Sequence, residues 1–172
     1  MIGTGRAGVA VVCALAVALA GGSLWAAMPE AGIALQRPGD AGQVRIEPGA
    51  PALHVVFFAT WCPPCVNELR RLGELDARWN ERGYRLVVIA VQNRHTADRL
   101  ARFISENEVP GELLFDADGS AQAALGAQRL PTHLVFAASG EEVLRAGGVD
   151  EGVGEAVQQL LGADRRPRGG AP

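Results

Sequence analysis

The sequence predicts an α/β domain in which helices flank a mixed central β-sheet. Two runs of apolar, β-branched and aromatic residues, at 53–59 and 85–91, have the length and composition of buried strands. Helical patterns of apolar residues alternate with these runs, and a turn sequence at Ser139-Gly140 separates two further strand-like segments. Strands and helices that alternate and then end in a hairpin are typical of a sheet with parallel and antiparallel strands.

The first strand-like run, at 53–59, leads into an amphipathic helix. Its apolar side chains recur at three- and four-residue spacing, which places them on one helix face: Val66, Leu69, Leu72, Leu75 and Trp79. Gly83 can end this helix, because glycine adopts the left-handed conformation of a helix C-terminus at little cost. The second strand-like run, at 85–91, follows directly.

The remaining elements are predicted from shorter patterns. Leu100, Phe103 and Ile104 indicate a second helix, which ends before Pro110. The other expected elements are a short strand at 113–115, an Ala-rich helix after the Asp118-Gly119 turn, strands at 134–136 and 143–144, and a last helix at 154–161.

The N-terminal residues 1–29 are predicted to be a signal peptide or an uncleaved membrane anchor. Arg6 precedes a stretch from Ala7 to Pro29 that carries no charged side chain, and a positive residue before an apolar run is typical of both. Both interpretations place the rest of the chain outside the cytoplasm. We therefore expect a periplasmic or other extracytoplasmic protein, held at the inner membrane if the segment is retained.

The 172 residues are predicted to form one folded domain with extensions. Residues 30–51 are rich in Gly and Pro and are expected to be a linker, with an edge strand at 44–46. The folded domain is expected at 52–162, and the basic, Gly- and Pro-rich residues 163–172 are expected to be a flexible tail. The net charge of -3 gives no indication of nucleic acid as a partner.

Cys62-Pro63-Pro64-Cys65 carries the predicted chemistry of the chain. The pair follows a buried strand and opens a helix, where unpaired N–H groups and the positive end of the helix dipole favour a thiolate, chiefly on the first sulfur. Both prolines fit the first helical turn, which needs no N–H from them, and they stiffen it. We expect Cys62 to be the nucleophile and Cys65 to resolve the mixed disulfide.

A structural disulfide and a metal site are the alternative interpretations of this pair. A disulfide that closes so short a loop removes little entropy from the unfolded chain. The histidines are His54, His95 and His133, and none forms a close ligand pair with the cysteines in sequence. Zinc held by a second cysteine pair is excluded, because the remaining cysteine is Cys13 in the apolar leader. Copper held by the two thiolates and one histidine stays open.

Two neighbours of the pair are candidate site residues. The ring of Trp61 can shield the sulfur and offer a flat contact surface, or it can cap the core. Glu68 lies three residues after Cys65 on the same helix, so its carboxylate is expected to face back toward the sulfurs. There it could accept the proton of Cys65. The alternative is a solvated helix residue that interacts favourably with the helix dipole.

The run from Val55 to Cys65, with Leu130-Pro131-Thr132 downstream, resembles the thioredoxin superfamily. More narrowly, it is similar to the TlpA/ResA/CcmG-like exported thiol–disulfide oxidoreductases. The similarity covers about residues 44–161 and implies a thioredoxin-like fold. The peroxiredoxin pattern fails, because Val55 and Ala59 stand where that pattern has Pro and Thr.

The resemblance implies roles for several residues. Pro131 is expected to be a cis-proline that faces the disulfide, and Leu130 before it is expected to pair with an extended substrate segment. Glu68 matches the position where this branch keeps an acid near the cysteines. Val56 stands where thioredoxin has a buried aspartate, so proton transfer by that route is unavailable and Glu68 becomes the main candidate.

The expected activity is reduction of disulfides on exported proteins by dithiol exchange, for example in cytochrome c maturation. The resemblance implies a membrane electron donor of the DsbD/CcdA type, and we expect no bound cofactor and no metal. Two alternatives stay open: a disulfide oxidase or isomerase, since the direction depends on the reduction potential, and a thiol-based copper metallochaperone.

Overall fold

The computed structural model describes residues 27–40, 42–91 and 97–163. The predicted leader at 1–29 and tail at 163–172 therefore lie outside the described residues, apart from their innermost positions. In the described ranges, no helix combines the length and apolar character needed to cross a membrane.

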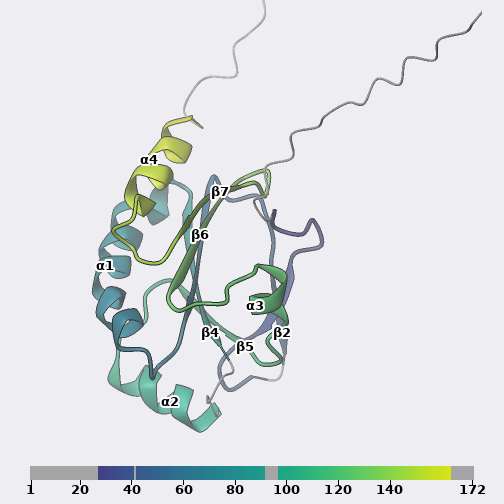
Figure 1. Ribbon diagram of the computed structural model, residues 1–172, viewed down its shortest axis with the longest axis vertical. Coiled ribbons are helices and arrows are strands. Elements are labelled where there is room, and N and C mark those ends of the chain that lie inside the picture. The colour runs from purple at the N-terminus through teal and green to yellow at the C-terminus, as the bar shows by residue number, and fades with distance from the viewer. Residues whose placement is uncertain (1–26, 41, 92–96, 164–172) are drawn as a thin grey trace, which may run out of the picture.

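The strands of the described ranges form one mixed sheet in the order β2-β1-β5-β4-β3-β6-β7 (Figure 1). The central strands β3, β4 and β5 are parallel, and the outer pairs are antiparallel. The strand bounds are β1 Ile33–Gln36, β2 Gln43–Ile46, β3 Ala52–Phe58, β4 Tyr84–Val91, β5 Glu112–Asp116, β6 Thr132–Ala137 and β7 Glu142–Ala146. The predicted mixed sheet is confirmed.

Helices cover both faces of this sheet. In Figure 1, α1 and α4 lie along one face with α2 at the end of that layer, and α3 lies against the other face. The bounds are α1 Pro63–Trp79, α2 Ala97–Glu106, α3 Ser120–Ala124 and α4 Val153–Ala163, with a 3-10 turn η1 at Asn80–Arg82. Gly83 ends this turn at φ 94°, as the sequence predicts.

The central strand β3 is buried along its whole length, because it lies between β4 and β6 and under helices on both sides. Its side chains alternate between the two faces. His54 and Val56 point to the face that α1 covers, whereas Leu53 and Val55 point to the face that α3 covers. The buried residues of these strands form the core.

The predicted linker at 30–51 needs a correction. The expected edge strand at 44–46 is present as part of β2, but residues Ile33–Gln36 form a further strand, β1. β1 pairs antiparallel with β2 and joins the sheet through Gln36 and Phe115 of β5. Its strand structure depends on these distant partners, since Ile33 and Leu35 are buried only when the hairpin lies on the sheet.

Candidate functional site

The cysteine pair lies where the buried strand β3 gives way to α1. Cys62 is the N-cap residue of α1, and its Sγ accepts a hydrogen bond of 3.3 Å from the N–H of Cys65. Pro63 and Pro64 occupy the first helical positions, as predicted. Cys62 and Cys65 form a disulfide, with 5.3 Å between their Cα atoms. The helix end therefore provides the N–H donors and the positive dipole that stabilise a thiolate at Cys62.

A groove runs beside the disulfide. Its lining comes from three parts of the chain: Trp61 to Pro64 at the start of α1, Gln122, Gln128 and Leu130 in and after α3, and Val91 of β4. Cys62 is the cysteine that lines this groove, while Cys65 is 2% exposed. Trp61 is 43% exposed, so its indole presents a contact surface at the rim rather than capping the core.

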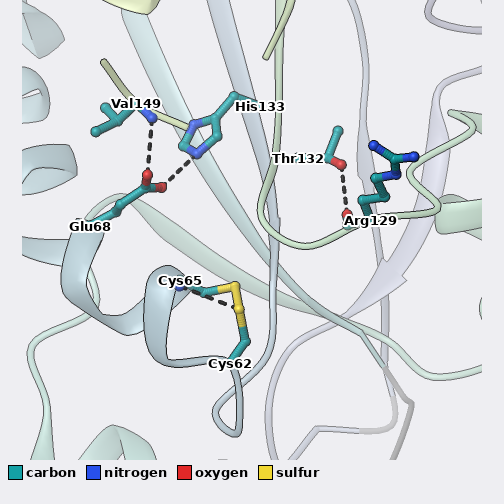
Figure 2. The surroundings of a disulfide bond; sticks show 7 residues. All are labelled: Cys62, Cys65, Glu68, Arg129, Thr132, His133 and Val149. Carbon is teal, nitrogen blue, oxygen red and sulfur yellow. Dashed lines mark hydrogen bonds and ion pairs between the residues drawn. A yellow bond between two sulfur atoms is a disulfide. The ribbon is translucent and has the colours of Figure 1, made fainter. Parts of the chain in front are cut away.

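The loop before β6 contributes the facing wall. The Leu130–Pro131 peptide bond is cis, which confirms the conformation expected for Pro131. The Thr132 hydroxyl donates a hydrogen bond of 2.7 Å to the carbonyl of Arg129 and so closes this turn (Figure 2). Leu130 lies in the groove with Cys62. The substrate-binding roles of Trp61, Leu130 and Pro131 remain predictions.

Glu68 lies on α1 one turn after Cys65, but its carboxylate is engaged away from the disulfide (Figure 2). Oε2 accepts a hydrogen bond of 2.8 Å from Nε2 of His133, and Oε1 accepts one of 3.2 Å from the N–H of Val149. The Glu68 side chain is 20% exposed, so it connects the protein interior with solvent. Its role as the proton acceptor of Cys65 remains a prediction.

Sequence reasoning missed that the two strand histidines belong to this site. Nδ1 of His133 lies 3.0 Å from Nε2 of His54, and Nδ1 of His54 lies 2.7 Å from the Tyr84 hydroxyl. Both histidines are fully buried. From the sequence alone, these histidines are candidate metal ligands only. The available signal was a polar residue inside an otherwise apolar strand, which requires a hydrogen-bonding partner.

Burial changes the titration of two of these groups. Desolvation, with the neighbouring His133 as a second cause, holds the pKa of His54 well below 6.5. Desolvation, with the charge of Asp76 as a second cause, raises the pKa of Tyr84 above its usual value. His54 is therefore a neutral imidazole and Tyr84 a neutral phenol near neutral pH.

Val56, at the position of the missing aspartate, pairs with His133 across β3 and β6. It is an apolar residue beside the buried polar cluster. In the described ranges, no three or more His, Cys, Asp or Glu side chains are grouped so that they could hold a metal ion.

A mixed sheet, a disulfide at the N-terminus of the helix after the central strand, and a cis-proline loop beside it define a protein of the thioredoxin-like class. Solved structures agree. A Chlorobium tepidum protein described as a thiol:disulfide interchange protein DsbE has a TM-score of 0.66 at 22% identity, over 82% of this chain and 98% of its own. A secreted Mycobacterium tuberculosis disulfide oxidoreductase has a TM-score of 0.61 at 19% identity, over 74% and 96%. These similarities show the fold.

Residues 39–160 match the Redoxin family model, and the chain belongs to this family. Among its relatives, thiol-disulfide oxidoreductase ResA of Halalkalibacterium halodurans is 27% identical over 106 residues, which are 61% of this chain and 59% of that protein. Nucleoredoxin of Bos taurus is 31% identical over 100 residues, which are 56% of this chain and 22% of that protein. The matched part is thus less than two thirds of either relative.

Proposed function

We propose that this chain is a thiol–disulfide oxidoreductase that reduces disulfides of exported proteins by exchange at Cys62 and Cys65. The observation that carries the proposal is the disulfide at the N-cap of α1, with Cys62 in a groove opposite Leu130. A purely structural disulfide would have no use for a helix dipole, for a groove or for a facing cis-proline loop.

The reaction uses the reduced pair. The Cys62 thiolate attacks one sulfur of a substrate disulfide, whose S–S bond breaks, and the other substrate sulfur leaves as a thiolate. Cys65 then attacks Cys62 in the mixed disulfide and releases the second substrate thiol. Two electrons pass to the substrate, and the Cys62–Cys65 disulfide remains.

The location and partners are part of this proposal. The ResA relatives and the secreted structural relative support a role outside the cytoplasm. There the oxidised chain needs a membrane electron donor, for which the DsbD/CcdA type is our candidate, and apocytochrome c cysteines are a candidate substrate. We propose that the segment at 1–29 exports the domain and, if retained, holds it at the inner membrane.

The equilibrium reduction potential of the Cys62–Cys65 couple tests the direction of the reaction. A value near that of thioredoxin, about -270 mV, is expected for a reductase, and a value near that of DsbA, about -120 mV, would make the chain an oxidase. Full-length protein equilibrated in dithiothreitol or glutathione buffers, followed by thiol alkylation, gives this value.

Trapping tests the order of attack. Cys65→Ser should accumulate substrates as mixed disulfides on Cys62, because the resolving thiol is gone. Cys62→Ser is the matched control and should trap none. Mixed disulfides recovered equally from both variants would contradict the assignment of Cys62 as nucleophile.

A further inference from the structure

Four side chains from four elements form one continuous chain of hydrogen bonds under α1. Tyr84 on β4, His54 on β3 and His133 on β6 lie diagonally across adjacent strands on one face of the sheet. Glu68 of α1 meets His133 at the end of this row. The row runs from the buried Tyr84 hydroxyl to a carboxylate that is 20% exposed and one turn from Cys65.

An ionised Glu68 sets the direction of every hydrogen bond in the row. A carboxylate can only accept, so Nε2 of His133 carries a proton. With His133 neutral, its Nδ1 accepts, and Nε2 of His54 must donate to it. Neutral His54 then accepts at Nδ1, and the Tyr84 hydroxyl donates. All the bonds point toward Glu68, and each polar atom is satisfied.

We propose that His133, His54 and Tyr84 are positioning residues that hold Glu68 in place to receive the proton that Cys65 loses when it attacks. This inference rests on the proposed function. Cys65 loses its proton as its sulfur attacks Cys62 in the mixed disulfide. Glu68 accepts that proton and later releases it to solvent, while the electron pair of the broken S–S bond leaves on the substrate thiolate. Nε2 of His133 already carries the proton that it donates to Glu68, so the row orients the carboxylate and does not take up the proton.

The surrounding charges fit this assignment. From α1, Glu68 faces His133, and the charge of Asp76 acts on Tyr84 at the other end. From the connection after β7, the N–H of Val149 holds the second oxygen of Glu68, and Asp150 beside it pairs with Arg71 of α1. β3, β4 and β6 contribute the three buried members. The row is therefore held from α1, from the connection after β7 and from three strands of the sheet.

A double-mutant cycle on the resolving step tests the positioning role. Excess Ellman's reagent forms a mixed disulfide on Cys62, and release of the second thionitrobenzoate reports the attack by Cys65. We expect Glu68→Gln to slow this release about 100-fold and His133→Gln about tenfold. If His133 acts through Glu68, the double variant should be no slower than Glu68→Gln. Effects that multiply independently, or a His133→Gln variant as fast as wild type, would overturn the proposal.

Lost packing is controlled separately. Val157→Ala removes buried volume from α4 and leaves the row intact, so the release should stay at the wild-type rate. If His133→Gln does not fold, Tyr84→Phe provides the test, because it removes a single oxygen at the far end of the row.

Nitrogen-15 NMR of the oxidised protein shows, without any substrate, which ring nitrogen of each histidine carries the proton. At alkaline pH both buried histidines should carry their proton on Nε2. Tyr84→Phe removes the hydroxyl that donates to Nδ1 of His54 and should shift the signal of that nitrogen. A wild-type His54 that carries its proton on Nδ1 would overturn the proposal.

The two failures can be told apart. If the wild-type protein forms the mixed disulfide but never releases the second thiol, the proposed function is wrong and the inference falls with it. If the wild type completes the exchange while the cycle or the tautomers behave otherwise than expected, only the role of the row is wrong.

Discussion

The two faces of the sheet bury two polar networks of different chemistry. On the α1 face, Glu68 meets the row His133, His54 and Tyr84. On the α3 face, Glu142 of β7 is buried and accepts two hydrogen bonds of 2.8 Å from Nε and Nη2 of Arg145. Arg145 also donates to the carbonyls of Leu125 and Gly126 beyond α3.

The difference lies in which protons can move. Arginine stays charged at every working pH, and its planar fork fixes a bidentate carboxylate. Arg145 and Glu142 therefore form a permanent ion pair, which links β7 to the segment after α3. Histidine exists in two neutral tautomers and one charged form. His54 in the row on the α1 face can therefore change tautomer, whereas Arg145 keeps its charge.

The largest expected change in stability comes from breaking the ion pair of Arg145 and Glu142. Arg145→Met should lower the free energy of unfolding by about 3 kcal/mol, because it leaves the Glu142 carboxylate buried without its partner. Urea unfolding measures this loss. Arg71→Met is the matched control, since it breaks an exposed pair with Asp150 and should cost less than about 1 kcal/mol. An equal loss of unfolding free energy in both variants would mean that the buried ion pair is no stronger than an exposed one.

The α1 face should make stability depend on pH. The pKa of His54 is held well below 6.5 in the folded protein, so below pH 6.5 the unfolded chain binds more protons at this residue. The stabilising contribution is complete above pH 6.5 and is lost as pH falls toward the folded pKa, by at most about 1.4 kcal/mol per pH unit. Urea unfolding of wild type and His54→Gln at several pH values measures it. An equally steep slope in the variant would assign the effect elsewhere.

Tyr84→Phe should have a smaller effect. It keeps the ring packed against Trp79 but removes the hydroxyl bonded to His54. We expect the free energy of unfolding to fall by about 1 kcal/mol, the net contribution of one hydrogen bond. Thermal and urea unfolding measure the change. A loss of several kcal/mol would indicate a packing role of the tyrosine beyond this bond.

The smallest effect should come from moving Glu68 without changing it. A Cβ at Gly148 would lie 3.1 Å from Oε1 of Glu68, so the carboxylate must shift by a few tenths of an ångström. Gly148→Ala should slow release of the second thionitrobenzoate about threefold. Gly162→Ala is the matched control, because a Cβ there meets open space. An equal slowing in both variants would show that the position of Glu68 does not matter.

The sequence predicts the elements that local patterns specify. The central strands, the helix that opens with Cys62, and the hairpin at Gly140 follow from runs of apolar residues and turn residues, and the structure confirms them. The strand β1 was missed, because its four residues carry no pattern of their own and become a strand by pairing with β2 and β5.

The row of polar residues could not be predicted for a related reason. His54 and His133 are 79 residues apart and meet because β3 and β6 pair in one particular register. Their neighbour Glu68 is a candidate from the sequence, but its orientation depends on His133 and on the N–H of Val149. A site formed by a short motif can be predicted from the local sequence. A site formed by residues on different strands can be predicted only when the register of the strands is known.

The hydrogen bonds of Arg145 also affect the groove beside Cys62. The segment from Leu125 to Leu130 is fastened at one end by Arg145, and the turn at Thr132 closes on Arg129 at the other. The opposite wall is the capped first turn of α1. Hydrogen bonds thus hold both sides of the groove, which favours a substrate that adapts its own conformation to the groove. If the chain reduces protein disulfides as proposed, such a groove would favour substrates that have not yet folded, because they can extend around an accessible disulfide.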